Sequence, residues 1–138
     1  MPNFSLDDGV FLEAARRFGT PLYLYDEAGI RKTARAVREA FAWCADFREY
    51  FAVKALPNPE ILRVMLEEEC GLDCSSESEL LLAEMAGARG RDIMFSANAM
   101  PARELGLALS AGAAINLDAA EDIDALASFG RFPEAISL

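Results

Sequence analysis

The chain has 138 residues, 53% of them hydrophobic, and a formal net charge of −10 at pH 7. That length suffices for one small domain with its own core, and the charge argues against a nucleic-acid-binding surface. No apolar run approaches the roughly 18 residues of a membrane helix. The start, MPNFSLDDGV, also lacks the basic residues of a signal peptide, so we expect neither a membrane span nor secretion.

Cysteine and histidine counts restrict the chemistry. The three cysteines, Cys44, Cys70 and Cys74, are an odd number without a secretion signal, which indicates reduced thiols in the cytoplasm. Because the chain has no histidine, Cys70 and Cys74 do not suggest a zinc site, and Ser-His or Cys-His catalysis is excluded within it. Any catalytic role must rest on lysine, aspartate, glutamate or a cofactor.

The first 45 residues carry three predicted elements. GVFLEAARRFG (9–19) has helical spacing, PLYLYD (21–26) reads as a strand, and EAGIRKTARAVREAFAW (27–43) predicts a long helix. Asp26 is placed to cap the long helix at its N-terminus. We expect the aromatic residues of this part to lie in a core, namely Phe11, Tyr23, Tyr25, Phe41 and Trp43.

From residue 46 onward, a short strand and a helix repeat about every 21 residues. The strands are expected at 48–54, 70–74, 92–96, 113–117 and 134–138. Helical spacing fills the segments 58–69, 77–87, 100–112 and 119–130, and the last three end on Gly87, Gly112 and Gly130. Alternation at a fixed short period predicts parallel βα units.

Three of these helices begin with capping sequences. Asn58 precedes a proline, which suits an N-cap followed by the first helical residue. Ser76 and Glu79 match the S-x-x-E capping box, and Asp118 with Glu121 repeats a capping pattern. These residues therefore have structural roles whether or not they also serve a site.

Polar residues at the strand ends decide between two architectures. Alternation places Tyr50, Ala52 and Lys54 on one face of the first strand. The next three strands also end in polar residues, which point away from the bulkiest apolar side chains. These polar residues are Asp73, Ser96 with Asn98, and Asn116. A doubly wound sheet binds ligands near its switch point, whereas a (β/α)8 barrel gathers functional residues around its carboxyl rim. We therefore predict an α/β fold, the N-terminal part of a TIM barrel with about five parallel strands.

This interpretation carries two expectations. The side chains expected to converge at one end of the sheet are Lys54, Asp73, Asn98 and Asn116. Eight units need roughly 170 residues, but only about 90 follow position 48. Residues 46–138 are then the first half of an enzyme barrel and 1–45 a separate N-terminal region. The unpaired edge of the fifth strand in this half barrel should favour association or aggregation.

Four motifs, in this order, resemble a known enzyme family. They are YFAVKALPNPEIL, GLDCSSESELLLAEMAG, DIMFSANAMP and INLDAAEDI. They are similar to segments of the fold-type III pyridoxal-phosphate-dependent decarboxylases, with a barrel of the alanine racemase-like type, and most of all to diaminopimelate decarboxylase. Ornithine decarboxylases share the pattern more loosely. The resemblance runs from about Gly19 to Leu138.

The resemblance implies that four residues contact pyridoxal 5'-phosphate. Lys54 matches the family lysine that joins the cofactor's aldehyde as a Schiff base, and we expect it to be buried, because burial favours a neutral amine. Ala52 matches a residue packed near the cofactor ring, Asp73 one that lines the pocket, and Glu79 one close behind the lysine. Leu56 departs from the family, since many members have asparagine there.

The resemblance also implies a larger whole protein. PLYLYD matches a strand that usually joins a second β-domain. The histidine that stacks on the cofactor, the glycine-rich phosphate site, the partner of the pyridine nitrogen and the substrate-carboxylate residues are expected beyond Leu138. A homodimer is implied for the full-length enzyme, and the 138 residues alone are expected to be inactive.

The implied activity is decarboxylation of a basic amino acid, most closely meso-diaminopimelate to L-lysine. Enzymes of the ornithine, lysine or carboxynorspermidine type are alternatives. An alanine racemase would carry a YGHG-like stretch after the lysine, where this chain has ALPNPE, and the non-catalytic cofactor carriers lack DCSS. Outside the family, a receiver-like signalling domain fits the size, but FSAN after the third periodic strand offers it no phosphorylatable aspartate.

Overall fold

A computed structural model describes residues 6–130 and 132–138. Two helices, α1 (Asp8–Phe18) and α2 (Glu27–Ala40), precede the alternating part. The strands that follow are β1 (Tyr50–Ala52), β2 (Gly71–Cys74), β3 (Ile93–Ser96), β4 (Ala114–Asn116) and β5 (Ile136–Ser137). The helices between them are α3 (Pro59–Glu67), α4 (Glu77–Ala86), α5 (Ala102–Ala111) and α6 (Ala120–Ala127), with short 3-10 turns η1 (Val53–Ala55) and η2 (Gly90–Asp92). Every predicted helix is confirmed to within a few residues.

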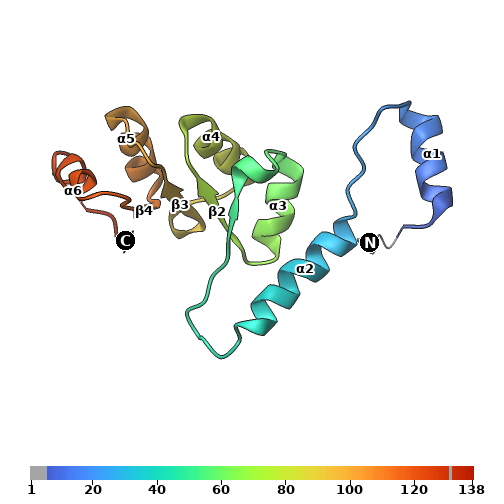
Figure 1. Ribbon diagram of the computed structural model, residues 1–138, viewed down its shortest axis with the longest axis horizontal. Coiled ribbons are helices and arrows are strands. Elements are labelled where there is room, and N and C mark those ends of the chain that lie inside the picture. Colours follow the sequence, from blue (N-terminus) through green and yellow to red (C-terminus); the bar gives the residue numbers. More distant parts are fainter. Residues whose placement is uncertain (1–5, 131) are drawn as a thin grey trace.

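The strands of the described ranges form one five-stranded sheet in the order β1-β2-β3-β4-β5, and each neighbouring pair is parallel. Strand order that simply follows chain order is the barrel arrangement, whereas a doubly wound sheet reverses direction at a switch point. The α/β fold predicted from the parity of the polar residues is therefore confirmed. Figure 1 shows α3 to α6 following one another along the sheet.

The core lies between the helices and one face of this sheet. Leu72, Cys74, Ile93, Phe95 and Ile115 alternate onto that face and are essentially inaccessible to solvent. Helices α3 and α4 pack against β2, and α5 packs against β4. On the opposite face, Gly71 and Ala114 are buried, whereas the larger or polar residues are half-buried, namely Asp73, Met94, Ser96 and Asn116. We call this second surface the open face.

Local signals explain most helix ends. The side chains of Asp26, Asn58 and Ser76 each accept a backbone N–H as N-caps, as predicted. Gly87 and Gly112 close α4 and α5 in the left-handed conformation, with φ of 103° and 74°.

Two predicted ends are wrong by a small shift. Helix α6 starts after Ala119, and the carboxylate of Asp122, not Glu121, accepts the N–H groups of Asp118 and Ala119 at 3.0 and 2.9 Å. Its C-cap is Ser128, so Gly130 lies beyond the helix end. Asp122 stands three residues after Ala119 and so has the reach of a capping-box acid.

Strand β1 is shorter than expected. It ends at Ala52, and the predicted strand residues Val53 and Lys54 belong to η1, closed by a bond from the Leu56 N–H to the Val53 carbonyl at 3.2 Å. The last register pair is Ala52 with Asp73, after which β2 has one residue left before the chain turns toward the cap of α4. With little partner strand remaining, the backbone of 53–55 makes a local turn.

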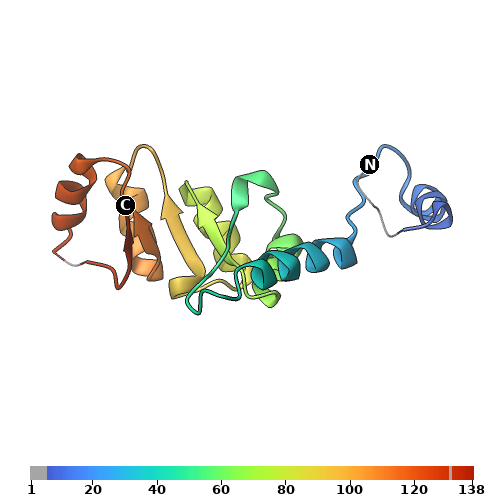
Figure 2. The ribbon, with the colours of Figure 1, turned by 60° about the horizontal axis from the view of Figure 1, so that its bottom comes forward.

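The N-terminal region differs most from expectation. The segment 21–26 is irregular and pairs with no strand among the described residues, so the predicted strand is not formed here. Its predicted association with a second β-domain stays a prediction. In Figures 1 and 2, α1 lies apart from the sheet, at the end of the molecule opposite β5.

The aromatic residues of this region are not in a core. Tyr23 is 90% exposed and Trp43 80%, and Phe11, Tyr25 and Phe41 are also exposed. They fail to be buried because no layer of helix or sheet from the described residues covers them. No helix in these ranges is long and apolar enough to cross a membrane.

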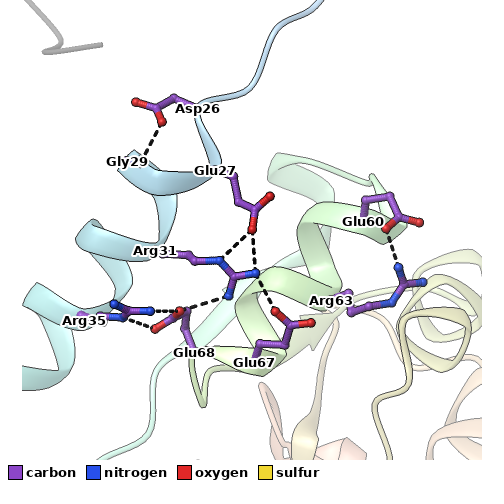
Figure 3. Close-up of polar contacts among 9 residues, drawn as sticks. All are labelled: Asp26, Glu27, Gly29, Arg31, Arg35, Glu60, Arg63, Glu67 and Glu68. Carbon is purple, nitrogen blue, oxygen red and sulfur yellow. Dashed lines mark hydrogen bonds and ion pairs between the residues drawn. The ribbon is translucent and has the colours of Figure 1, made fainter. Parts of the chain in front are cut away.

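An ion-pair network joins α2 to the C-terminal end of α3 (Figure 3). Arg35 donates to both carboxylate oxygens of Glu68 at 2.6 Å, and Arg31 donates to Glu68 at 3.1 Å and to Glu67 at 2.6 Å. Glu68 is buried, at 5% exposure. A run of glutamates at a helix C-terminus opposes the helix dipole, so the arginines offset an unfavourable charge.

We expect Glu68→Gln to lower the stability of the chain more than Glu67→Gln, because Glu67 is exposed and pairs with one arginine. Hydrogen bonds from Arg35, and then from Arg31, lower the pKa of Glu68 from 4.5 to about 2, although burial opposes them. A carboxyl with a depressed folded-state pKa contributes stability above its unfolded value and loses it in acid. In urea titrations, the difference between the unmodified chain and Glu68→Gln should shrink between pH 4.5 and 2. A pH-independent difference would contradict this account.

Candidate functional site

The carboxyl end of the open face brings together residues from β1, η1 and β2. Ala52 is the register partner of Asp73, so the two occupy neighbouring strands at the same level. Lys54 follows two residues later, on η1, and its charge opposes the rise that burial causes in the pKa of Asp73. The structure therefore places three of the four predicted site residues, Ala52, Lys54 and Asp73, at the same end of the sheet. The fourth, Glu79, lies in the first turn of α4.

Asp73 carries the strongest sign of an unsatisfied site. Its Oδ1 atom is buried, yet it has no hydrogen-bond partner among the described residues. Burial raises the pKa of this carboxyl, Glu79 raises it further, and Lys54 opposes both. Since buried polar atoms are nearly always hydrogen-bonded, this oxygen is an acceptor suited to a donor that the described residues do not supply.

Glu79 combines a structural role with a place beside Asp73. Its own N–H donates to the Ser76 hydroxyl at 3.4 Å, which forms half of the predicted capping box. Its carboxylate does not return to Ser76; instead it accepts the Ser75 N–H at 2.8 Å and the Ser75 hydroxyl at 3.2 Å. Glu79 thus takes part in the start of α4, and its charge adds to the rise that burial causes in the pKa of Asp73. Its role as a site residue stays a prediction.

Lys54 is exposed, which corrects the expectation of a buried amine. The reason is its position on the short turn η1, beyond the end of β1. The side chain is therefore accessible to a ligand approaching the open face.

The two ends of β1 carry side chains of different size on the open face. Tyr50 lies over Gly71, where any Cβ would overlap the Tyr50 ring, and its hydroxyl donates to the Arg91 carbonyl at 2.8 Å. Two residues along the strand, the same face carries only the methyl group of Ala52. A planar group can thus lie over Ala52 without displacing a large side chain of this strand.

Further polar residues line the same face on the later strands. Ser96 is in register with Asn116, and Asn116 with Ser137, so the three form a row across neighbouring strands. Asn116 occupies the predicted face. Asn98, by contrast, lies two residues beyond β3 and is exposed, and no contact among the described residues links it to Lys54.

Ser75 and Ser137 are two further polar residues of this face that the sequence did not single out as candidates for the site. The alternation of β2 places Ser75 on the face of Asp73, but nothing in the sequence indicated its contact with Glu79. Ser137 lies on the short terminal strand, where apolar neighbours gave little contrast.

Comparisons with known proteins agree with this geometry. The model of a family described as pyridoxal-dependent decarboxylase, pyridoxal binding domain, matches residues 27–135. Protein TabA of Pseudomonas amygdali pv. tabaci is 52% identical over 106 residues, which are 77% of this chain and 25% of that protein. Diaminopimelate decarboxylase of Deinococcus radiodurans is 39% identical over 119 residues, which are 86% of this chain and 31% of that enzyme.

Solved structures give the same result. Diaminopimelate decarboxylase from M. jannaschii, in complex with L-lysine, superposes with a TM-score of 0.80 at 28% identity, covering 89% of this chain and 31% of that one. Lysine/ornithine decarboxylase from Vibrio vulnificus superposes with a TM-score of 0.78 at 22% identity, over 88% of this chain and 33% of that one, and supports the fold alone. The chain thus spans about a quarter to a third of the length of these relatives.

Proposed function

This chain belongs to the pyridoxal-dependent decarboxylase family, through its pyridoxal-binding domain, and we propose that Lys54 is the residue that bonds the cofactor. The proposed activity of the whole protein is decarboxylation of a basic amino acid, meso-diaminopimelate to L-lysine. The observation that carries the proposal is the buried Asp73 oxygen, which has no hydrogen-bond partner among the described residues and lies on the strand next to Ala52, two residues before Lys54. A family match over 27–135 supports pyridoxal phosphate as the cofactor.

The residues present fit this cofactor. The ε-amine of Lys54, once it has lost its proton, can attack the aldehyde carbon, with release of one water molecule. When bound, the cofactor's ring takes up the electron pair left as carbon dioxide departs from the α-carbon of an amino acid. Ala52 leaves space for a planar ring, and Asp73 offers an acceptor to a donor on the ligand. Glu79 adds negative charge, which favours positive charge on nearby groups.

Two observations favour diaminopimelate over other diamino acids as the substrate. Enzymes named diaminopimelate decarboxylase from Deinococcus radiodurans and Thermoplasma acidophilum are 39% and 35% identical to this chain. Among the superposed structures, diaminopimelate decarboxylase from M. jannaschii shares 28% identity with this chain. Lysine or ornithine decarboxylation is therefore the second candidate. The receiver-like alternative fails, because the strand order lacks the switch point of a doubly wound sheet.

The proposal extends to the setting of the enzyme. We propose that the full-length protein is a cytoplasmic homodimer, because its resemblance to this decarboxylase family implies that state. The cysteines Cys44, Cys70 and Cys74 are free thiols in the structure, as suits a reducing compartment.

The test is a panel of amino-acid substrates, assayed with the full-length protein in the presence and absence of added pyridoxal phosphate. We expect carbon dioxide release from meso-diaminopimelate, dependence on the cofactor, and slower release from L-lysine or L-ornithine. If L-lysine or L-ornithine is turned over faster than meso-diaminopimelate, lysine or ornithine decarboxylation becomes the first candidate. Release that does not depend on the cofactor would reject the assignment.

A further inference from the structure

We infer that Ser75 is a positioning residue, whose backbone and hydroxyl hold the Glu79 carboxylate in one orientation at the carboxyl end of β2. The inference deepens the proposed function and rests on it for the meaning of the site. The hydrogen bonds themselves do not depend on that function, so the two can be tested separately.

The contacts converge on one carboxylate from one residue. The Ser75 N–H donates to Glu79 Oε2 at 2.8 Å, and the Ser75 hydroxyl lies 3.2 Å from both Oε1 and Oε2. Both residues are half-buried, so water competes less than at a free surface. A single N–H would leave the carboxylate free to rotate about that bond, and the hydroxyl removes this freedom. Ser75 therefore fixes where the negative charge of Glu79 lies.

That fixed charge acts on the groups around it. From β2, Asp73 and Cys74 both have pKa values raised first by burial and then by Glu79, with that of Cys74 raised to about 12. From η1, Lys54 opposes the effect at Asp73. Glu77, the other acid in the first turn of α4, makes different contacts. Its N–H donates to Glu104 and its carboxylate pairs with Arg103.

Loss of the Ser75 hydroxyl should therefore change the pKa of Asp73. Without it, the Glu79 carboxylate can swing toward solvent, and its repulsion of the Asp73 charge weakens. The pKa of Asp73 then falls toward its ordinary value, while burial still holds it above that value. The neighbouring hydroxyl of Ser76 binds a backbone N–H, not the carboxylate, and offers a matched control.

The experiment follows the side-chain carboxyl carbon of Asp73 by NMR during a pH titration of the full-length protein without added cofactor, with Asp73→Asn for assignment. We expect Ser75→Ala to lower the midpoint by a few tenths of a pH unit, Ser75→Thr to restore it, and Glu79→Gln to lower it similarly. The double variant Ser75→Ala/Glu79→Gln should fall no further than Glu79→Gln alone. Ser76→Ala should lower the unfolding midpoint without moving the Asp73 titration.

An unchanged Asp73 titration in Ser75→Ala, or the same shift in Ser76→Ala, would overturn the inference. Additive shifts in the double variant would overturn it as well. Failure of the proposed function has a different signature, because the full-length protein would then show no absorption band from lysine-bound cofactor, whatever the Asp73 titration does.

Discussion

Lys54→Ala in the full-length protein should abolish the visible absorption band of lysine-bound pyridoxal phosphate and slow decarboxylation by several orders of magnitude. The reason is that the alanine methyl group cannot bond the aldehyde, so the cofactor is neither fixed nor oriented over the open face. The measurement is a spectral titration with cofactor, followed by carbon dioxide release under saturating cofactor.

Two further variants make this prediction specific. Lys54→Arg should fail almost as completely, because the guanidinium stays protonated and does not form the bond. Lys32→Ala, a change on the exposed surface of α2, should leave the band and the rate unchanged. A normal band in Lys54→Ala would show that another lysine holds the cofactor.

Phe95→Ala should cause the largest loss of stability, because Phe95 is fully buried between Cys74 and Ile115, its register partners on β2 and β4. Truncating a buried phenylalanine costs about 3–5 kcal/mol, through lost transfer energy and a cavity. Folded domains are stable by only about 5–15 kcal/mol, so this loss is a large share. Urea unfolding monitored by circular dichroism measures it.

The matched control is Met94→Ala, one residue earlier on the same strand. Met94 faces the open side and is half-buried, so its truncation should cost clearly less than that of Phe95. Equal losses at the two positions would mean that both faces of the sheet are covered, which would contradict the arrangement of helices described above.

The βα part of the fold could be predicted because its signals are local. Alternation within a strand places Leu72 and Cys74 opposite Asp73, and burial follows that alternation in the structure. Capping residues act on N–H groups two or three positions away, so Asn58 and Ser76 were readable from neighbours alone. Parity at successive strand ends then favoured the barrel arrangement.

Errors arose where a residue depends on distant parts of the chain. Tyr23 and Trp43 look like core residues by composition, but burial needs a covering layer, and none is formed by the described residues. The position of Lys54 on a turn depends on where β2 stops pairing with β1. Neither fact is contained in the nearby residues.

The charged contacts between α2 and α3 were equally unreadable. Arg35 and Glu68 are 33 positions apart, and each looks like an ordinary exposed charge on an amphipathic helix. Only the packing of the two helices reveals that Glu68 is buried. The contact between Ser75 and Glu79 was not predicted for a related reason, because a serine before a helix suggests a cap before it suggests a partner for a carboxylate.

The bond between Lys54 and the cofactor is tested most directly by trapping it. The full-length protein is loaded with pyridoxal phosphate, reduced with borohydride, digested, and its peptides are mapped by mass spectrometry. The account predicts the reduced cofactor on the peptide containing Lys54, at a stoichiometry close to one per chain, and none there in Lys54→Ala. Label on a different lysine of the unmodified protein, or no stable label at all, would contradict it.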